Sequence, residues 1–172
     1  MTTLSRRLFC LLGAGALLSG CTAAIAPAPK LGHTGPGGLS QAAILSAING
    51  TRARYGKPPL RYNQRLEAAA RSQAQLMARK DQLSHNLGVT LRQRVTDAGY
   101  LGAVGENVAG GQKTLEQAIQ GWLDSPPHRN TLLSTKFIEF GLAAATVPSG
   151  KKSRYGVYWA FIAGGDFDAW RV

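Results

Sequence analysis

Two histidines and one glutamate are the residues of this sequence whose types best suit shared chemistry. His85, Glu106 and His128 stand 21 and 22 residues apart, so only a folded chain could bring them together. Neutral imidazole and carboxylate are usual ligands of zinc and other divalent cations. A glutamate beside a histidine would also raise that histidine's affinity for a proton, as in a general base and its orienter. A hydrogen-bonded cluster that only fixes loops is the third interpretation, and spacing leaves all three open.

Predicted helices must position these side chains. A serine offers the N-cap of a helix over 40–55, and Asn63 offers the N-cap of a second helix. Apolar residues recur at helical spacing in the second helix until about Leu83, which would place His85 just after its carboxyl end. A third, shorter helix is predicted over 91–98.

The remainder of the chain predicts one more helix and then strands. Thr114 begins a capping-box pattern, and the helix that follows would break at Pro126–Pro127, just before His128. The stretches 138–147 and 155–162 are apolar or alternating on either side of a turn, as in an antiparallel hairpin. Helices first and strands last indicate an α+β fold.

Residues 1–20 predict an export signal. Arg6 and Arg7 precede an apolar stretch over 8–18 that is too short for a permanent membrane span. The run Ser5-Arg6-Arg7-Leu8-Phe9 resembles a twin-arginine signal, and Sec export stays open as the alternative route.

The run Leu18-Ser19-Gly20-Cys21 resembles a lipobox, which predicts a diacylated Cys21 that would hold the protein on a membrane surface. The alternative is a plain secretory signal with an incidental cysteine. Residues 21–38, rich in Ala, Pro and Gly, predict a flexible tether, and residues 39–172 one globular domain. Thr22 after the cysteine favours the periplasmic face of the outer membrane in a Gram-negative cell.

Composition limits the partners. Without residues 1–20, 18 Lys and Arg face 9 Asp and Glu, a formal charge of +9 with no dense basic run. This charge suits either attraction to anionic lipid headgroups or wall polymers, or simple solubility. Nucleic acid is excluded as an expected partner of an exported protein. Cys10 leaves with the signal and Cys21 carries lipid, so no pair is left for a disulfide and the fold must rest on packing.

Several motifs in order resemble the bacterial branch of the CAP superfamily, the cysteine-rich secretory, antigen 5 and pathogenesis-related 1 proteins. The motifs are Asn49-Gly50-Thr51-Arg52 with Pro59-Leu60, Asn63 to Ala70, Ser84-His85, Gly105-Glu106-Asn107-Val108-Ala109, Trp122, Ser125-Pro126-Pro127-His128-Arg129 and Phe140-Gly141. The resemblance implies a three-layer α-β-α sandwich with an open groove whose floor carries two histidines and acidic partners.

Carried over by position, the resemblance makes His85, Glu106 and His128 the cavity residues and the metal ligands if a metal binds. The family's second glutamate, three residues after the helix tryptophan, is replaced here by Ser125, with Asp124 beside it, and both are taken as further cavity residues. Asp124 could substitute only if its helix presents it inward.

Three neighbouring features carry smaller expectations. Asn107 is expected to turn or hydrogen-bond the backbone beside the site, and Arg129 either to bind an anion at the groove or to form a surface salt bridge. Large aromatic side chains are expected in the core between helix and sheet, namely Trp122, Tyr158 and Trp159.

Two main functions compete. The first is a non-enzymatic, Cys21-tethered envelope module that binds a lipid-like or envelope-derived ligand in or near the groove, with a His/Glu cavity able to take a divalent metal. The second is a metal-dependent or serine-type hydrolase of peptides or envelope polymers, with Ser84 and Ser125 as the nearest hydroxyls. The sequence holds no G-x-S-x-G or H-E-x-x-H run, which disfavours the hydrolase. A surface protein acting on a host is a third possibility that the residues do not address.

Overall fold

The computed structural model describes residue 35 and residues 37–171, all of which belong to one compact unit. The predicted signal peptide (1–20), Cys21 and most of the predicted tether (21–38) lie outside the described residues. In the described part of the chain, no helix has the length and apolar character needed to cross a bilayer.

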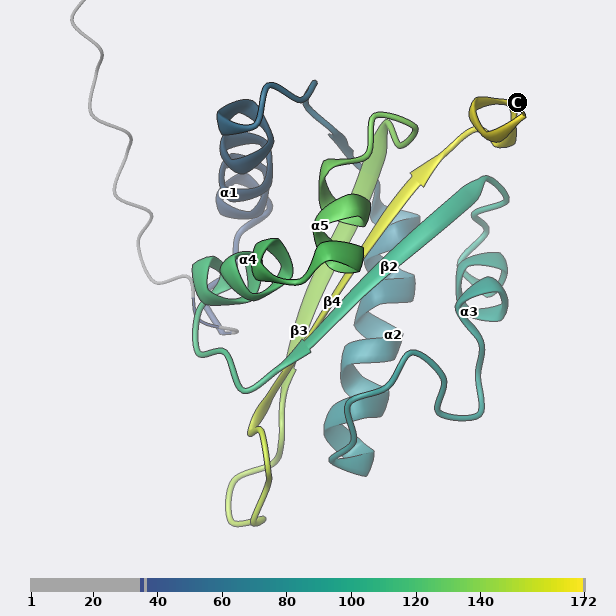
Figure 1. Ribbon diagram of the computed structural model, residues 1–172. Helices are drawn as coiled ribbons and strands as arrows, with labels where there is room; N and C mark the ends of the chain where they lie inside the picture. The colour runs from purple at the N-terminus through teal and green to yellow at the C-terminus, as the bar shows by residue number, and fades with distance from the viewer. Residues whose placement is uncertain (1–34, 36, 172) are drawn as a thin grey trace, which may run out of the picture. The chain divides into compact units, whose positions relative to one another are not determined.

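Five α-helices, four strands and a 3-10 helix make up the described fold. In chain order they are α1 Gln41–Arg54, β1 Arg61–Tyr62, α2 Gln64–Lys80, α3 Leu91–Asp97, β2 Ala103–Gly110, α4 Leu115–Asp124, α5 Pro126–Leu133, β3 Glu139–Thr146, β4 Val157–Gly165 and the 3-10 helix η1 Phe167–Trp170 (Figure 1).

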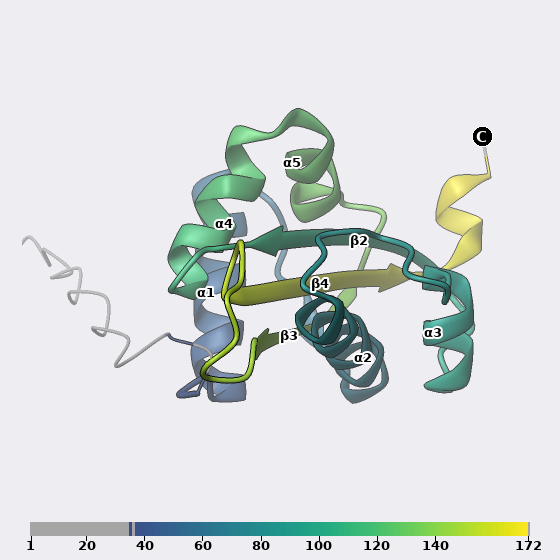
Figure 2. The ribbon, with the colours of Figure 1, turned by 90° about the horizontal axis from the view of Figure 1, so that it is seen from below.

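The four strands form one sheet in the order β1-β3-β4-β2, and helices cover both of its faces. β1 pairs with β3 in parallel, whereas β4 pairs antiparallel with both β3 and β2. Figure 2 shows α2 against one face and α4 with α5 on the other, and α1 packs against α4. The architecture is the three-layer α-β-α sandwich that the resemblance implied.

β4 lies at the centre of the fold, and its side chains are therefore buried on both faces of the sheet. Alternate residues pack into two separate cores. Trp159 and Phe161 face the core that contains Trp122 of α4, whereas Tyr158 and Ile162 face the core built on α2. The prediction that the large aromatic residues are buried is confirmed, since Trp122, Tyr158 and Trp159 are each at most 1% exposed.

The predicted N-caps are all present. The Ser40 hydroxyl accepts from the Ala43 amide, and the Thr114 hydroxyl accepts from the Gln117 amide. The Asn63 side chain accepts from the amides of Arg65 and Leu66. Each cap satisfies a helix-end amide that has no partner within the helix.

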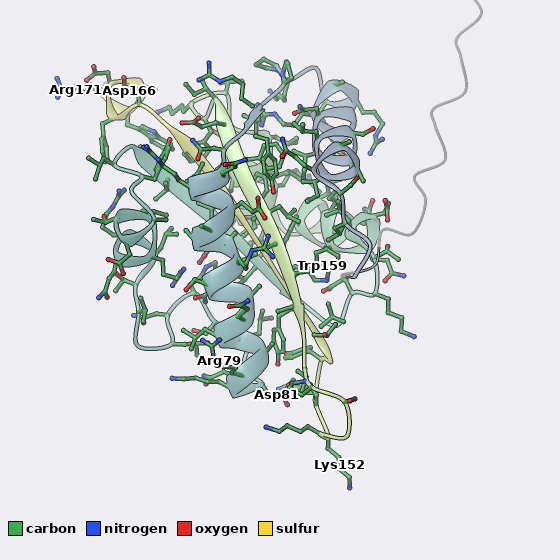
Figure 3. The ribbon with its side chains drawn as sticks, turned by 180° about the vertical axis from the view of Figure 1, so that it is seen from behind. Arg79, Asp81, Lys152, Trp159, Asp166 and Arg171 are labelled. Atoms are coloured by element: carbon green, nitrogen blue, oxygen red, sulfur yellow. The ribbon has the colours of Figure 1, made fainter. Side chains whose placement is uncertain are left out.

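The expectation that α2 continues to about Leu83 is wrong. The helix ends at Lys80 because Asp81 takes a left-handed conformation with φ 49°. Its carboxylate accepts from the hydroxyls of Ser153 and Tyr158 and from the Arg154 amide, which joins the end of α2 to the segment before β4. Figure 3 shows Asp81 at this end of the molecule, near the β3–β4 loop that carries Lys152.

Two elements near the candidate site were missed from the sequence. Pro126 and Pro127 end α4 as predicted, but they also begin α5, because proline is tolerated in a first turn whose amides have no helical partner. β2 was not predicted, since Gly105, Glu106 and Asn107 all have low strand propensity. Pairing with β4 along its whole length overrides that propensity.

Candidate functional site

His85 and Glu106 meet as the sequence predicted. His85 lies in the loop between α2 and α3, and Glu106 lies on β2. The Nδ1 atom of His85 is 2.8 Å from Oε2 of Glu106. Because an ionised carboxylate only accepts, Nδ1 carries the proton in this bond. The two side chains differ in accessibility, since that of His85 is 55% exposed and that of Glu106 is 1% exposed.

Arg94 of α3 is the residue that sequence reasoning missed. Its Nη2 atom lies 2.6 Å from Oε1 of Glu106, and both side chains are 1% exposed. Its Nη1 donates to the carbonyls of His85 and Val89, so the same guanidinium also holds the loop that carries the histidine. The available signal was a charged residue beside Val95 on the buried side of a short helix.

His128 stands in the first turn of α5 with its ring stacked on that of His85. The ring centroids are 6.5 Å apart and the planes are inclined by 30°. Nδ1 of His128 lies 2.8 Å from Oγ of Ser125. Ser125 occupies the N-cap position of α5, yet its side chain makes no capping bond and meets the imidazole instead.

The surroundings shift the pKa values of the two imidazoles in opposite directions. The hydrogen bond to Glu106 raises the pKa of His85, more than burial lowers it. Burial lowers the pKa of His128, and the neighbouring His85 lowers it further. The pair therefore favours a charged His85 beside a neutral His128, which is an arrangement that suits either proton exchange or recognition of a polar group.

A three-ligand metal site made of His85, Glu106 and His128 does not fit this geometry. Both carboxylate oxygens of Glu106 are engaged, one by Arg94 and one by His85. No group of three His, Cys, Asp or Glu side chains that could hold a metal ion occurs among the residues the structure describes. A metal would have to use the two imidazoles, with Glu106 as the group that orients one of them.

Asp124 does not replace the family's second glutamate. It is exposed at the end of α4, where its Oδ1 accepts from Gln120, so the expectation that it could join the cavity is wrong. Asn107 does hydrogen-bond the backbone, because its Nδ2 donates to the carbonyl of His128 at 2.8 Å. This bond fastens α5, and with it His128, to β2. Ser84 bonds the backbone of its own loop and not a histidine ring.

Comparison with known sequences agrees with the fold and the motifs. The sequence signature of the cysteine-rich secretory protein family (CAP) matches residues 45–162, and the chain belongs to this family. The uncharacterized protein YkwD of Bacillus subtilis (strain 168) is 29% identical over 102 residues. The match covers 58% of this chain and 40% of YkwD, so this chain spans less than half of that relative.

Solved structures are similar in fold. An extracellular protein with an SCP domain from Bacillus anthracis str. Ames matches with a TM-score of 0.62 and 24% identity, over 73% of this chain and 40% of its own. An outer surface protein of Borrelia burgdorferi also gives a TM-score of 0.62, with 22% identity over 73% of this chain and 91% of its own. At such identities the likeness shows the fold alone.

Proposed function

We propose that this CAP protein is an exported envelope protein, tethered through a lipidated Cys21, that binds a lipid-like or envelope-derived ligand at the surface formed by His85 and His128. The described geometry supports binding better than catalysis. The single observation behind the proposal is that a buried ion pair ends in an exposed imidazole: Glu106 and Arg94 are enclosed, whereas more than half of the His85 side chain faces solvent. A cluster serving only to join loops has no need for an exposed end.

The two rings offer complementary hydrogen-bonding atoms. Protonated His85, the form that Glu106 favours, supplies a donor at Nε2, and neutral His128 supplies a donor or an acceptor according to its tautomer. Among the described residues, neither Nε2 atom has a hydrogen-bond partner. A ligand with a polar or acidic head would satisfy both atoms, and its remainder would lie outside the sheet.

Export rests on separate observations. Arg6, Arg7 and the apolar stretch that follows them predict a signal peptide, and the two structural relatives above are named as extracellular and outer surface proteins. Labelling cells with radioactive palmitate tests the anchor: the chain should become labelled, and Cys21→Ala should abolish both the label and membrane fractionation. A labelled Cys21→Ala chain would contradict the lipobox.

Ligand capture tests the site. We expect the Cys21→Ala chain, purified without detergent, to carry an extractable envelope compound, identified by mass spectrometry. Adding His85→Ala or His128→Ala should lose the compound with little change in melting temperature. A variant that keeps the compound, or that loses it only by unfolding, would contradict the proposal. Zinc titration of the same variants by calorimetry tests the metal expectation, and the engaged Glu106 predicts no tight three-ligand binding.

One observation favours a serine-type hydrolase as the second candidate. Ser125 and His128 stand in hydrogen-bond contact at 2.8 Å, as a nucleophile and its base would. Within the described residues, however, no carboxylate contacts the His128 ring to orient it. Fluorophosphonate labelling lost in Ser125→Ala would promote this candidate over the binding module.

A further inference from the structure

The described residues also form a cavity of about 670 Å³. It lies where α5 ends, β2 begins and η1 follows β4, elements that gather at one end of the sheet (Figure 1). His85, Glu106 and His128 do not line it. Its volume falls within the range of pockets that enclose small molecules.

Among the described residues, three cations and no carboxylate line this cavity. Lys57 comes from the loop after α1, Arg129 from α5 and Lys136 from the loop before β3. None of the three takes part in an ion pair within the described residues. Arg129 therefore does not form the surface salt bridge considered from its sequence: its Nε donates to the Leu123 carbonyl, and its two terminal nitrogens have no protein partner in the described chain. Three unpaired cations around one hollow attract an anion.

Two aromatic side chains, Phe137 and Trp170, form another part of the wall. Phe137 is 4% exposed and packs on Trp170, with ring centroids 5.5 Å apart. Trp170 is 45% exposed, and the Nζ atom of Lys136 lies 4.5 Å from the centroid of its ring. Gly105 also lines the cavity and packs against Phe137, since a Cβ there would come 2.9 Å from the Phe137 ring. A ligand held here would have an apolar body beside its charged group.

We propose that this cavity is a second binding site, specific for a small anionic amphiphile. A carboxylate or phosphate head binds beside Lys57, Arg129 and Lys136, and the apolar body lies against Phe137 and Trp170. The site is separate from the histidine surface, so it can fail or succeed independently of the function proposed above.

The chain offers an internal fluorescent probe for this site. Of its three tryptophans, Trp122 and Trp159 are at most 1% exposed, and Trp170 lies in the cavity wall. The full chain carrying Cys21→Ala, which cannot be acylated, is titrated with decanoate and decyl phosphate below their micelle concentrations. Three controls are used: decanamide is neutral, decyltrimethylammonium is cationic, and inorganic phosphate has no apolar chain.

We expect both anionic amphiphiles to change Trp170 fluorescence saturably and the three controls to bind at least about tenfold more weakly, the loss that one charge-assisted hydrogen bond produces. Lys136→Gln and Arg129→Gln should each weaken decanoate about tenfold or more. Lys151→Gln, which changes an exposed lysine outside the cavity, should leave it unchanged. Trp170→Phe should remove the fluorescence change while calorimetry still records binding. Arg129 also joins α5 to α4, so its variant can lose the fold as well as the ligand. If it unfolds, the Lys136→Gln result alone tests the site.

Decanamide binding as tightly as decanoate would overturn the anionic half of the proposal, and inorganic phosphate binding as tightly would overturn the amphiphile half. Unchanged affinity in Lys136→Gln, or an equal loss of affinity in Lys151→Gln, would overturn the assigned site. Preference for decanoate over decyl phosphate would identify a carboxylate source such as a free fatty acid, and the reverse preference a phosphate monoester.

Discussion

Arg94 and Glu106 form an ion pair of 2.6 Å in which both side chains are only 1% exposed, and this pair supports the exposed His85. Removing one partner would leave a buried, uncompensated charge. We expect Arg94→Met to destabilise the protein by about 3–5 kcal/mol in urea unfolding. Arg71→Ala breaks the exposed i,i+4 pair with Glu67 and is expected to cost about 0–1 kcal/mol. Equal losses in the two variants would contradict the role assigned to the buried pair.

The pKa values of His85 and His128 should lie on opposite sides of the ordinary value of about 6.5. In proton NMR, we expect His85 to lose its proton at a higher pH than His128, because Glu106 holds the charged form of His85. Glu106→Gln should lower the pKa of His85. His33→Gln removes the chain's third histidine and completes the assignment. His128 titrating above His85 would contradict the geometry.

These titrations also set the sign of the pH dependence of stability. A raised folded pKa means that the His85 contribution is fully present below about pH 6.5 and is lost as pH rises through the folded pKa. The lowered pKa of His128 has the opposite effect, since its contribution is present above about pH 6.5 and is lost as pH falls. In His85→Ala, the loss of unfolding free energy relative to the parent chain should therefore be larger at pH 5 than at pH 8. In His128→Ala it should be larger at pH 8 than at pH 5. A shift of the same sign in both would exclude the assignment.

Gly141 is required where α2 crosses β3. A Cβ at this position would stand 2.0 Å from the Glu67 amide nitrogen, which is backbone and cannot move aside. Gly141→Ala should destabilise the fold by about 1–3 kcal/mol or more, through overpacking. Gly50, exposed in α1 with no atom near its missing Cβ, is the matched control, and Gly50→Ala should stabilise by about 0.5–1 kcal/mol. Chemical denaturation of both variants gives the comparison.

Asp81 joins the end of α2 to the start of β4, and its removal should loosen that junction. Asp81→Gly keeps the left-handed backbone without strain but deletes the acceptor for Ser153, Tyr158 and Arg154. We expect faster amide hydrogen exchange across 147–157 than in the parent chain. Asp81→Asn tolerates the same backbone and retains an acceptor oxygen, so its exchange rate should lie between those of the parent chain and Asp81→Gly. Exchange in Asp81→Gly that matches the parent would show that the junction depends on other contacts.

The sequence alone determined the elements whose signals are local. Ser40, Asn63 and Thr114 cap their helices through bonds that reach only two or three residues along the chain, so their residue types were sufficient. The apolar stretches of β3 and β4 predicted a hairpin in the same way. The order of the motifs identified the CAP family and, through it, the meeting of His85, Glu106 and His128.

Only the tertiary structure decided what the site contains. Arg94 looked like one of many surface arginines until α3 packed it against Glu106 and gave both charges 1% exposure. Asp124 could have faced inward or outward, and the packing of α4 turned it to solvent. Glu106 stood in a segment whose local propensity opposed a strand, and pairing with the distant β4 overrode that propensity. The physical reason is common to these cases: burial and ion pairing depend on neighbours from other parts of the chain, which residue spacing does not encode.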